Sequence, residues 1–204
     1  MKYVIAFLLS ALVWIPSASA NLIVNGSFDQ FEQQPTRSWS IYQSLVGWET
    51  TAGAGIEVGR YSLYTGSSVE SDNPWVVELD SRNNSAMTQV VDILEASYYE
   101  LSFSYAARTN RADDNVVNVS FDPIDSALAS FNETKSSQQG WQSVNYEFWL
   151  APGEYSLTFQ GGGISNSYGG LIDAVSLIDV EAPATPLLAG IALFGLMLSR
   201  RVKR

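Results

Sequence analysis

The stretch YELSFSYA, residues 99–106, carries the clearest structural signal in the sequence. Aromatic or aliphatic residues occupy positions 99, 101, 103 and 105, and Glu or Ser stands at each position between them. A period of two is typical of a β-strand with one face in the core, because successive side chains point to opposite sides. The stretch is therefore predicted to be a half-buried strand.

The same alternation recurs further along the chain, at residues 117–121, 144–148 and 155–159. Clusters of Gly, Pro, Asn, Asp, Ser and Thr separate the predicted strands. No stretch sustains a helical period over three turns, although residues 125–131 are compatible with one short helical turn. Many short strands without helices between them predict an all-β fold, either an antiparallel β-sandwich or a barrel.

Residues 1–20 have the layout of a secretory signal peptide. Lys2 provides the positive start, residues 4–15 form an apolar run, and Ala18-Ser19-Ala20 is a small-residue cleavage site. A buried N-terminal helix is the alternative interpretation. We expect cleavage to leave Asn21 as the first residue of an exported protein.

Residues 181–204 combine a Pro-containing spacer, an apolar run at 187–198, and a basic end with Arg200, Arg201, Lys203 and Arg204. Even counted from Ala184 the apolar run has fifteen residues, fewer than the roughly twenty that span a bilayer comfortably. The layout resembles the PEP-CTERM sorting tail of Gram-negative bacteria, although the family's Pro-Glu-Pro is Glu181-Ala182-Pro183 here.

This resemblance implies an exosortase-type sorting enzyme as a partner and transient anchoring in the inner membrane through the tail. It also implies a final location at the cell surface or in the extracellular matrix. A permanent tail anchor is the alternative. Either way, the expected organisation is a signal peptide (1–20), one β-sandwich domain (21–180) and a tail (181–204).

The region between the two ends is strongly acidic. All twenty-one acids lie between Asp29 and Glu181, together with only six bases, which gives this part a net charge of −15. Such a charge repels nucleic acid and anionic lipid headgroups. We therefore expect no nucleic acid among the partners.

The sequence contains no Cys and no His. Disulfides cannot stabilise the fold, and a hydrolase built on a Ser-His or Cys-His pair is excluded because its base is missing. Zinc and copper sites lose their preferred ligands, so metals that prefer oxygen ligands remain the plausible ones.

Several stretches, taken in order, resemble a known group of domains. They are NLIVNGSFD (21–29), Gly47-Trp48, VELD (77–80), YELSFSYA (99–106), YSLTF (155–159) and LIDAVSL (171–177). Together they resemble the galactose-binding-like jelly rolls, especially the cell-wall family called domain of unknown function 642 and the carbohydrate-binding modules of families 4, 9 and 22. The resemblance spans the whole of residues 21–180 and implies a jelly-roll β-sandwich.

In those modules an acid that closes the first stretch and an Asp in the last strand share a structural calcium ion. The equivalent residues here are Asp29 and Asp173, and Ca²⁺ takes oxygen ligands of this kind. Residues 21–29 are then expected to be the first strand, bent at Asn25-Gly26 and held beside the last strand. The alternative is a solvated loop acid at Asp29 and a strand-edge acid at Asp173.

The resemblance favours a non-catalytic carbohydrate-binding module that engages an extracellular polysaccharide. Trp149 is the leading candidate for sugar contact, because it shares strand parity with Asn145 and Glu147 and should point away from the core. The further candidates lie in or beside predicted loops and are Tyr61, Tyr64, Trp75, Arg108 and Tyr168. Trp48 and Trp141 are assigned to the core.

Two other function classes stay open at this point. One is a structural or adhesive matrix protein with the same fold and no sugar site. The other is a glycoside hydrolase that would use paired carboxylates such as Glu78 and Asp80, or Asp113 and Asp114. Acids two residues apart on one strand do not straddle a substrate, so we predict that the protein is not an enzyme.

Overall fold

The computed structural model describes residues 20–65, 74–123, 125–131 and 140–180. The predicted signal peptide, apart from Ala20, and the predicted sorting tail lie outside these residues. No helix in the described ranges is long and apolar enough to cross a membrane.

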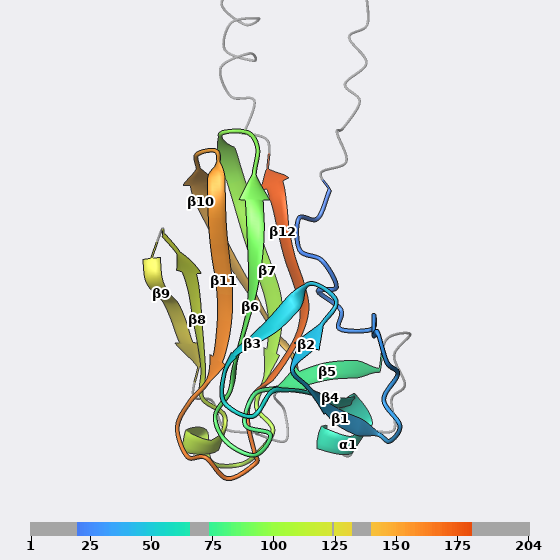
Figure 1. The fold of residues 1–204 in the computed structure, drawn as a ribbon. Coiled ribbons are helices and arrows are strands. Elements are labelled where there is room, and N and C mark those ends of the chain that lie inside the picture. Colours follow the sequence, from blue (N-terminus) through green and yellow to red (C-terminus); the bar gives the residue numbers. More distant parts are fainter. Residues whose placement is uncertain (1–19, 66–73, 124, 132–139, 181–204) are drawn as a thin grey trace, which may run out of the picture.

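Within the described residues, twelve strands form two antiparallel six-stranded sheets that pack face to face (Figure 1). One sheet, called sheet A here, has the order β1 (Trp39–Tyr42), β4 (Ile56–Arg60), β5 (Trp75–Glu78), β12 (Leu171–Val180), β7 (Ser97–Ala106) and β10 (Gln142–Leu150). Sheet B has the order β2 (Ser44–Leu45), β3 (Trp48–Ala52), β6 (Ala86–Ile93), β11 (Gly153–Gly161), β8 (Val117–Asp122) and β9 (Asp125–Phe131). The predicted antiparallel β-sandwich is confirmed.

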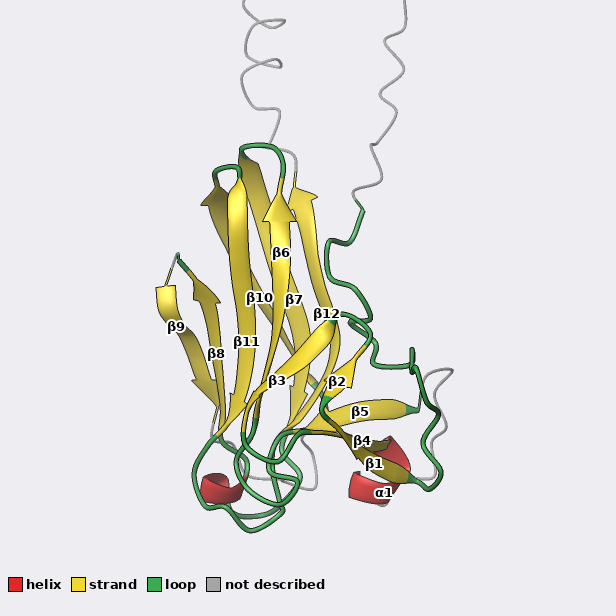
Figure 2. Cartoon of the chain, viewed as in Figure 1, coloured by secondary structure: helices red, strands yellow, loops and turns green. Residues whose placement is uncertain are grey.

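Two short helical segments accompany the strands, as Figure 2 shows. They are α1 (Tyr61–Thr65), which follows β4, and a 3₁₀ turn at Ala112–Asp114, which follows β7. Residues 125–131 form strand β9, so the short helical turn considered for this segment is wrong. Their pairing with β8 supplies the backbone hydrogen bonds that an isolated helical turn would have lacked.

The alternation in residues 99–106 places the core as predicted. Leu101, Phe103 and Tyr105 are buried on the inner face of β7, whereas Glu100 and Ser102 lie on the outer face. The Phe103 ring meets the Phe159 ring of sheet B edge to face, with centroids 5.1 Å apart. Each fully buried side chain of this size contributes roughly 1.5 to 3 kcal/mol.

The two tryptophans assigned to the core differ in depth. Trp48 is fully buried and packs between Phe28 and Phe159, with ring centroids 5.7 Å and 6.0 Å away. Trp141 is only half-buried and belongs to a smaller cluster under α1, where it stacks on Tyr61. Trp48 therefore links the N-terminal stretch to sheet B, and the Phe103–Phe159 contact joins the two sheets.

Residues 21–30 do not form the first strand that was expected, because they are built of bends and turns. Asn25 and Phe28 have positive φ angles of 53° and 55°, and this curls the chain out of an extended path. The chain therefore bends at Asn25-Gly26 as expected, but the positive φ is at Asn25 and not at Gly26. Gly26 is needed for a different reason, since a Cβ there would overlap the carbonyl oxygen of Val175.

The curled stretch nevertheless lies beside the last strand, as predicted. The amide of Leu22 donates to the carbonyl of Leu177 at 2.8 Å, and the amide of Val175 donates to the carbonyl of Gly26 at 2.9 Å. β12 carries a bulge between Asp173 and Ser176, at the level of this contact. The two ends of the described domain are thus held side by side by backbone hydrogen bonds.

The sandwich has two distinct ends (Figure 1). α1 and the 3₁₀ turn lie at one end, together with the loops that leave β7 and enter β12; this is the loop end. β10 and β12 finish at the other end, where β7 begins; this is the terminal end.

Candidate functional site

An open pocket of about 410 Å³ lies at the loop end. Its lining residues are Leu63, Tyr64, Arg108, Thr109, Asn110 and Tyr168. They come from α1, from the loop after β7 and from the loop before β12, which are far apart in sequence. The pocket thus brings together three of the six predicted sugar-binding candidates, Tyr64, Arg108 and Tyr168.

Arg108 lies between two tyrosine rings in this pocket. Its guanidinium carbon is 4.6 Å from the centroid of the Tyr64 ring and 4.8 Å from that of the Tyr168 ring. Tyr64 is buried, whereas Tyr168 is 48% exposed and forms an outer rim. A guanidinium held between aromatic faces gains cation–π attraction from both, so its orientation in the pocket is well defined.

The place of Tyr64 follows from a glycine on β4. A Cβ at Gly59 would overlap the hydroxyl oxygen and ring of Tyr64, so only glycine leaves room for that ring above the strand. The Tyr64 hydroxyl donates to Oε1 of Glu57 at 2.9 Å. Tyr61 and Tyr64, which were expected in or beside loops, lie in the short helix α1.

Two buried glutamates lie beneath the pocket. Glu57 of β4 and Glu78 of β5 are register partners, and they are 7% and 0% exposed. Nη1 of Arg108 is 3.4 Å from Oε2 of Glu78. Burial and the charge of Glu57 raise the pKa of Glu78 to about 8, against the opposing effect of Arg108. The raised pKa therefore favours the protonated form of one of these two glutamates at neutral pH.

This pair predicts a pH dependence of stability. The pKa of Glu78 is about 8 in the folded protein, against 4.5 for an ordinary Glu. The stabilisation is therefore complete below about pH 4.5 and is lost as the pH rises to about 8, at about 1.4 kcal/mol per pH unit for one proton. We expect the free energy of unfolding from urea titrations to fall over this range.

The matched variant is Glu78→Gln, which keeps the shape of the side chain and removes its titration. Its free energy of unfolding should fall less steeply between pH 5 and pH 8 than that of the wild type. Equal slopes for the two proteins would show that Glu78 is ionised throughout this range.

Asp80 organises the loop that carries Tyr168. Its Oδ2 accepts hydrogen bonds from the amides of Asn166, Ser167 and Tyr168 at 2.7, 3.0 and 3.3 Å. Its Oδ1 accepts another from the Ser165 hydroxyl at 3.1 Å. Asp80 is 1% exposed and lies just beyond the end of β5. A buried carboxylate with this many donors holds the rim in one conformation.

Asn115 organises the loop that carries Arg108. Its Oδ1 accepts from the amides of Arg108 and Thr109 at 2.9 and 3.0 Å, and its Nδ2 donates to the carbonyls of Thr109 and Arg111, both at 2.9 Å. Asp114 links the two loops, because it accepts from Thr109 Oγ1 and from Asn166 Nδ2, both at 2.9 Å. The pocket walls are therefore connected to each other through buried polar side chains.

The other candidates lie outside this pocket. Tyr61 stacks on Trp141 with ring centroids 5.5 Å apart. Trp75 begins β5, packs edge to face on Phe31, and lies under the Arg60 guanidinium at 5.3 Å. Both rings therefore already have partners in the fold.

Trp149 lies at the terminal end, on the outer face of β10. It is 55% exposed and stands opposite Tyr98 of β7, which is 44% exposed. The Trp149 side chain therefore points to the outer face of the strand, as the alternation along the sequence predicted. The structure therefore separates the leading candidate from the pocket by the length of the sandwich (Figure 1).

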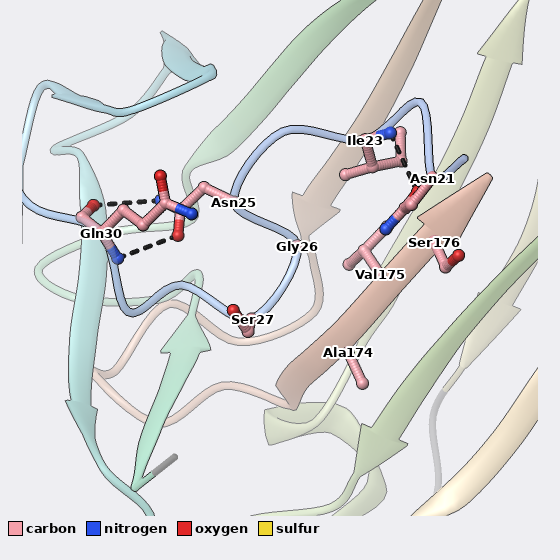
Figure 3. Close-up of a pocket in the computed structure, with 9 residues that line it drawn as sticks. All are labelled: Asn21, Ile23, Asn25, Gly26, Ser27, Gln30, Ala174, Val175 and Ser176. Atoms are coloured by element: carbon pink, nitrogen blue, oxygen red, sulfur yellow. Dashed lines mark hydrogen bonds between the residues drawn. The ribbon is translucent and has the colours of Figure 1, made fainter.

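The predicted metal ligands, Asp29 and Asp173, lie where the curled N-terminal stretch meets the bulge of β12. A shallow pocket of about 370 Å³ opens beside this contact. Figure 3 shows the stretch facing Ala174, Val175 and Ser176, with Asn25 hydrogen-bonded twice to the backbone of Gln30. Asn25 and Gln30 thus stabilise the curl that ends at Asp29.

The two carboxylates interact electrostatically. Burial raises the pKa of Asp173 to about 7, and the negative charge of Asp29 contributes to the rise. Neither acid belongs to a salt bridge with a described residue. The described residues hold no group of three or more acids that could bind a metal, so an ion here would need further oxygen ligands from the backbone or from neutral side chains. Carboxylates and such oxygens are chemically suited to Ca²⁺.

Several residues in and around the loop-end pocket were not foreseen. Leu63, Thr109 and Asn110 line it, whereas Glu57 and Asn115 lie outside the lining and hold Tyr64 and the Arg108 loop in place. Glu57 had a visible signal, because it stands in the otherwise apolar stretch IEVG at 56–59. A single acid in such a strand indicates either an exposed face or a buried polar group, and Glu57 is buried. The loop residues carried no comparable signal.

An antiparallel jelly-roll sandwich with a pocket in its end loops is an architecture of the galactose-binding-like class. The sequence of residues 21–178 matches the family described as "Protein of unknown function (DUF642)". The chain belongs to this family, so the predicted resemblance to domain of unknown function 642 is confirmed. No curated protein matches the chain.

Solved structures similar to this chain include two carbohydrate-binding modules. One is a family 61 module in complex with β-1,4-galactotriose, with a TM-score of 0.52 and 16% identity, covering 79% of this chain and all of the module. Another is a family 16 module, with a TM-score of 0.50 and 14% identity, covering 78% of this chain and all of the module. At these identities the likeness establishes the fold alone.

Proposed function

We propose that this protein is a non-catalytic carbohydrate-binding module that binds an extracellular polysaccharide through the loop-end pocket. One observation carries the proposal. An exposed aromatic ring, Tyr168, and a charged hydrogen-bond donor, Arg108, are presented side by side at an open pocket by loops that buried side chains hold in place. The fold shared with carbohydrate-binding modules supports the same conclusion.

The chemistry of the pocket suits a sugar. An aromatic face packs well against the C–H face of a pyranose ring, and a planar guanidinium donates to hydroxyl oxygens. Leu63, which is 47% exposed, adds an apolar surface to the lining of the pocket. Because the loops are already ordered by Asp80 and Asn115, binding would cost little conformational entropy.

The burial and contacts of two acids considered for catalysis, Glu78 and Asp80, support a non-catalytic function. Glu78 is fully buried and faces Arg108, while both oxygens of Asp80 accept hydrogen bonds from loop residues. A glycosidase needs two carboxyl groups that flank the scissile bond of a bound sugar. Asp80 instead fixes the conformation of a loop, and Glu78 contacts the side chain of Arg108.

The sugar proposal is tested with polysaccharide pull-down and calorimetry on Tyr168→Ala and Tyr168→Phe. Loss of the ring should weaken binding by about twofold to tenfold, since one stacking contact is worth about 0.5 to 1.5 kcal/mol. Tyr168→Phe keeps the ring and should bind within a few-fold of the wild type. Binding to cells or to itself that sugars do not compete for, and that is equal in both variants, would instead favour a structural or adhesive matrix protein.

We further propose a structural Ca²⁺ ion held by Asp29 and Asp173. The repulsion between these two acids and the lack of a basic partner among the described residues support it. When bound, the ion would neutralise both carboxylates and link the N-terminal stretch to β12. This link would serve in place of a disulfide, which the sequence cannot make.

Calcium removal provides the test. Addition of Ca²⁺ to chelator-treated protein should raise its melting temperature, and a hundredfold excess over Kd corresponds to about 2.7 kcal/mol. Asp173→Asn should abolish this rise, while Asp92→Asn, which changes an exposed acid on β6, should keep it. A melting temperature that is the same with Ca²⁺ and with chelator would contradict the calcium site.

The proposed location follows from the two ends of the chain. We propose export from the cytoplasm of a Gram-negative bacterium, transient anchoring in the inner membrane, and processing of the tail by an exosortase-type enzyme. The acidic domain would then act at the cell surface or in the extracellular matrix. The layouts of residues 1–20 and 181–204 support this proposal.

A further inference from the structure

The outer face of sheet A carries an ordered surface at the terminal end. Because β10, β7 and β12 are in register, their outward residues form three rows across the strands. The rows are Trp149–Tyr98–Val180, Glu147–Glu100–Ile178 and Asn145–Ser102–Ser176. Neighbouring rows lie about 7 Å apart along the strands. We call these nine residues the sheet A face.

The first row presents two large aromatic rings to solvent. Trp149 is 55% exposed and Tyr98 is 44% exposed. They are cross-strand partners on adjacent strands, so the two side chains are neighbours on this face. Exposed aromatic pairs of this kind are suited to stack on flat ligands and to attract cations through their π faces.

The second row places two negative charges together. Glu147 and Glu100 are direct cross-strand partners on the same face. Like charges in this position destabilise a sheet. The salt bridges of the described residues, Arg108–Glu78 and Arg111–Asp114, both lie at the loop end, so neither neutralises this pair.

Charges around the sheet A face add to its negative potential. Strands β7, β10 and β12 contain no Lys or Arg. Asp92, Glu95 and Glu154 are exposed at the same end of the sandwich. An anionic polymer or lipid would therefore be repelled from this face, whereas a cationic group would be attracted.

We propose that the sheet A face binds a polysaccharide that carries free, protonated amino groups, that is, a polymer of amino sugars. Its ammonium groups would lie between Glu147 and Glu100, and its sugar rings would stack on Trp149 and Tyr98. Asn145 and Ser102 in the next row would hydrogen-bond to hydroxyls. Because the three rows follow one another along the strands, they would contact successive sugar units of an extended chain.

This inference adds a ligand class and a second site to the proposed function, and it does not depend on the loop-end pocket. The two sites lie at opposite ends of the sandwich. One domain that binds glycan at both ends would cross-link two polysaccharide chains. Cross-linking of this kind is expected of a component of the extracellular matrix, and a module with a single binding site could not provide it.

The experiment is calorimetry with a glucosamine hexamer and an N-acetylglucosamine hexamer at mildly acidic pH, where the free amines are protonated. The wild type should bind the glucosamine hexamer, and added salt should weaken this binding. The double variant Glu100→Gln/Glu147→Gln and the single variant Trp149→Ala should each weaken it by about tenfold or more. All of these changes are on the surface, so the variants should stay folded, and the glutamine double variant should melt at or slightly above the wild-type temperature because the like-charge pair is gone.

The control variant Tyr168→Ala should bind the glucosamine hexamer as the wild type does, which separates this site from the loop-end pocket. Equal binding of the acetylated hexamer, or full binding by the glutamine double variant, would overturn the inference. Binding of oligolysine without binding of the glucosamine hexamer would also overturn it, in favour of a basic protein as partner. Loss of binding in Tyr168→Ala alone would assign the amino sugar to the pocket instead.

Discussion

Gly26→Ala is expected to destabilise the protein by about 3 kcal/mol or more. The new methyl group would overlap the carbonyl oxygen and carbon of Val175, which are backbone atoms of β12 and cannot move independently. Relief of the overlap requires the N-terminal stretch to move away, which breaks the hydrogen bond from the Val175 amide to the Gly26 carbonyl. Overpacking and a lost buried hydrogen bond together give this magnitude.

Urea unfolding of the β-sandwich domain measures this effect, with Gly140→Ala as the control. No described atom lies within 4 Å of a Cβ at Gly140, so that substitution should change the free energy of unfolding by less than about 0.5 kcal/mol. If both glycine variants were equally stable, the N-terminal stretch would not be packed on the bulge of β12.

Asp80→Asn is expected to destabilise the loop end by about 3 kcal/mol or more. The oxygens of Asp80 accept hydrogen bonds from three amides and one hydroxyl. The side-chain NH₂ of asparagine would face some of these donors, and buried donors left without an acceptor are costly. The loop that carries Tyr168 should then lose its fixed conformation, and sugar binding should be lost in variant protein that is still folded.

Asp113→Asn is the matched control, because Asp113 is an exposed acid in the neighbouring 3₁₀ turn. It should leave both the free energy of unfolding and sugar binding close to those of the wild type. Faster hydrogen exchange at the amides of residues 166–168 in Asp80→Asn would confirm that the loop is the affected part. Normal sugar binding by folded Asp80→Asn would contradict the role given to this loop.

Much of the fold could be predicted from the sequence because its physical cause is local. A strand with one buried face must alternate, and β7, β10 and β11 show this alternation in their exposure as well as in their residues. The exposed position of Trp149 follows from the same parity. Turn residues marked the loops between these strands for the reason that Gly, Pro, Asn and Asp favour turns.

The N-terminal stretch was misread because local pattern and tertiary partner disagree. An apolar run before Asn-Gly is typical of a strand that enters a hairpin. Here the side chain of Gln89 takes the place of a partner strand, since it accepts from the Val24 amide at 2.7 Å and donates to the Val24 carbonyl at 2.9 Å. A glutamine that is distant in sequence cannot be recognised in this role from a pattern.

The candidate site was predictable only in part. Tyr64, Arg108 and Tyr168 were chosen because aromatics and arginines in loops are often functional, but the same reasoning also chose Tyr61 and Trp75. Which of them converge depends on the packing of α1 over Gly59 and on the hydrogen bonds of Asp80 and Asn115. These are contacts between segments that lie far apart in the sequence.

The most direct test of the account is to map where a neutral oligosaccharide binds. Amide chemical shifts of the β-sandwich domain would be followed by NMR during titration with an oligosaccharide selected by pull-down. The account predicts that the shifts change at residues 108–110 and 166–168, at the loop end. Changes confined to other surfaces, or no change with any oligosaccharide, would contradict the proposal that the loop-end pocket binds carbohydrate.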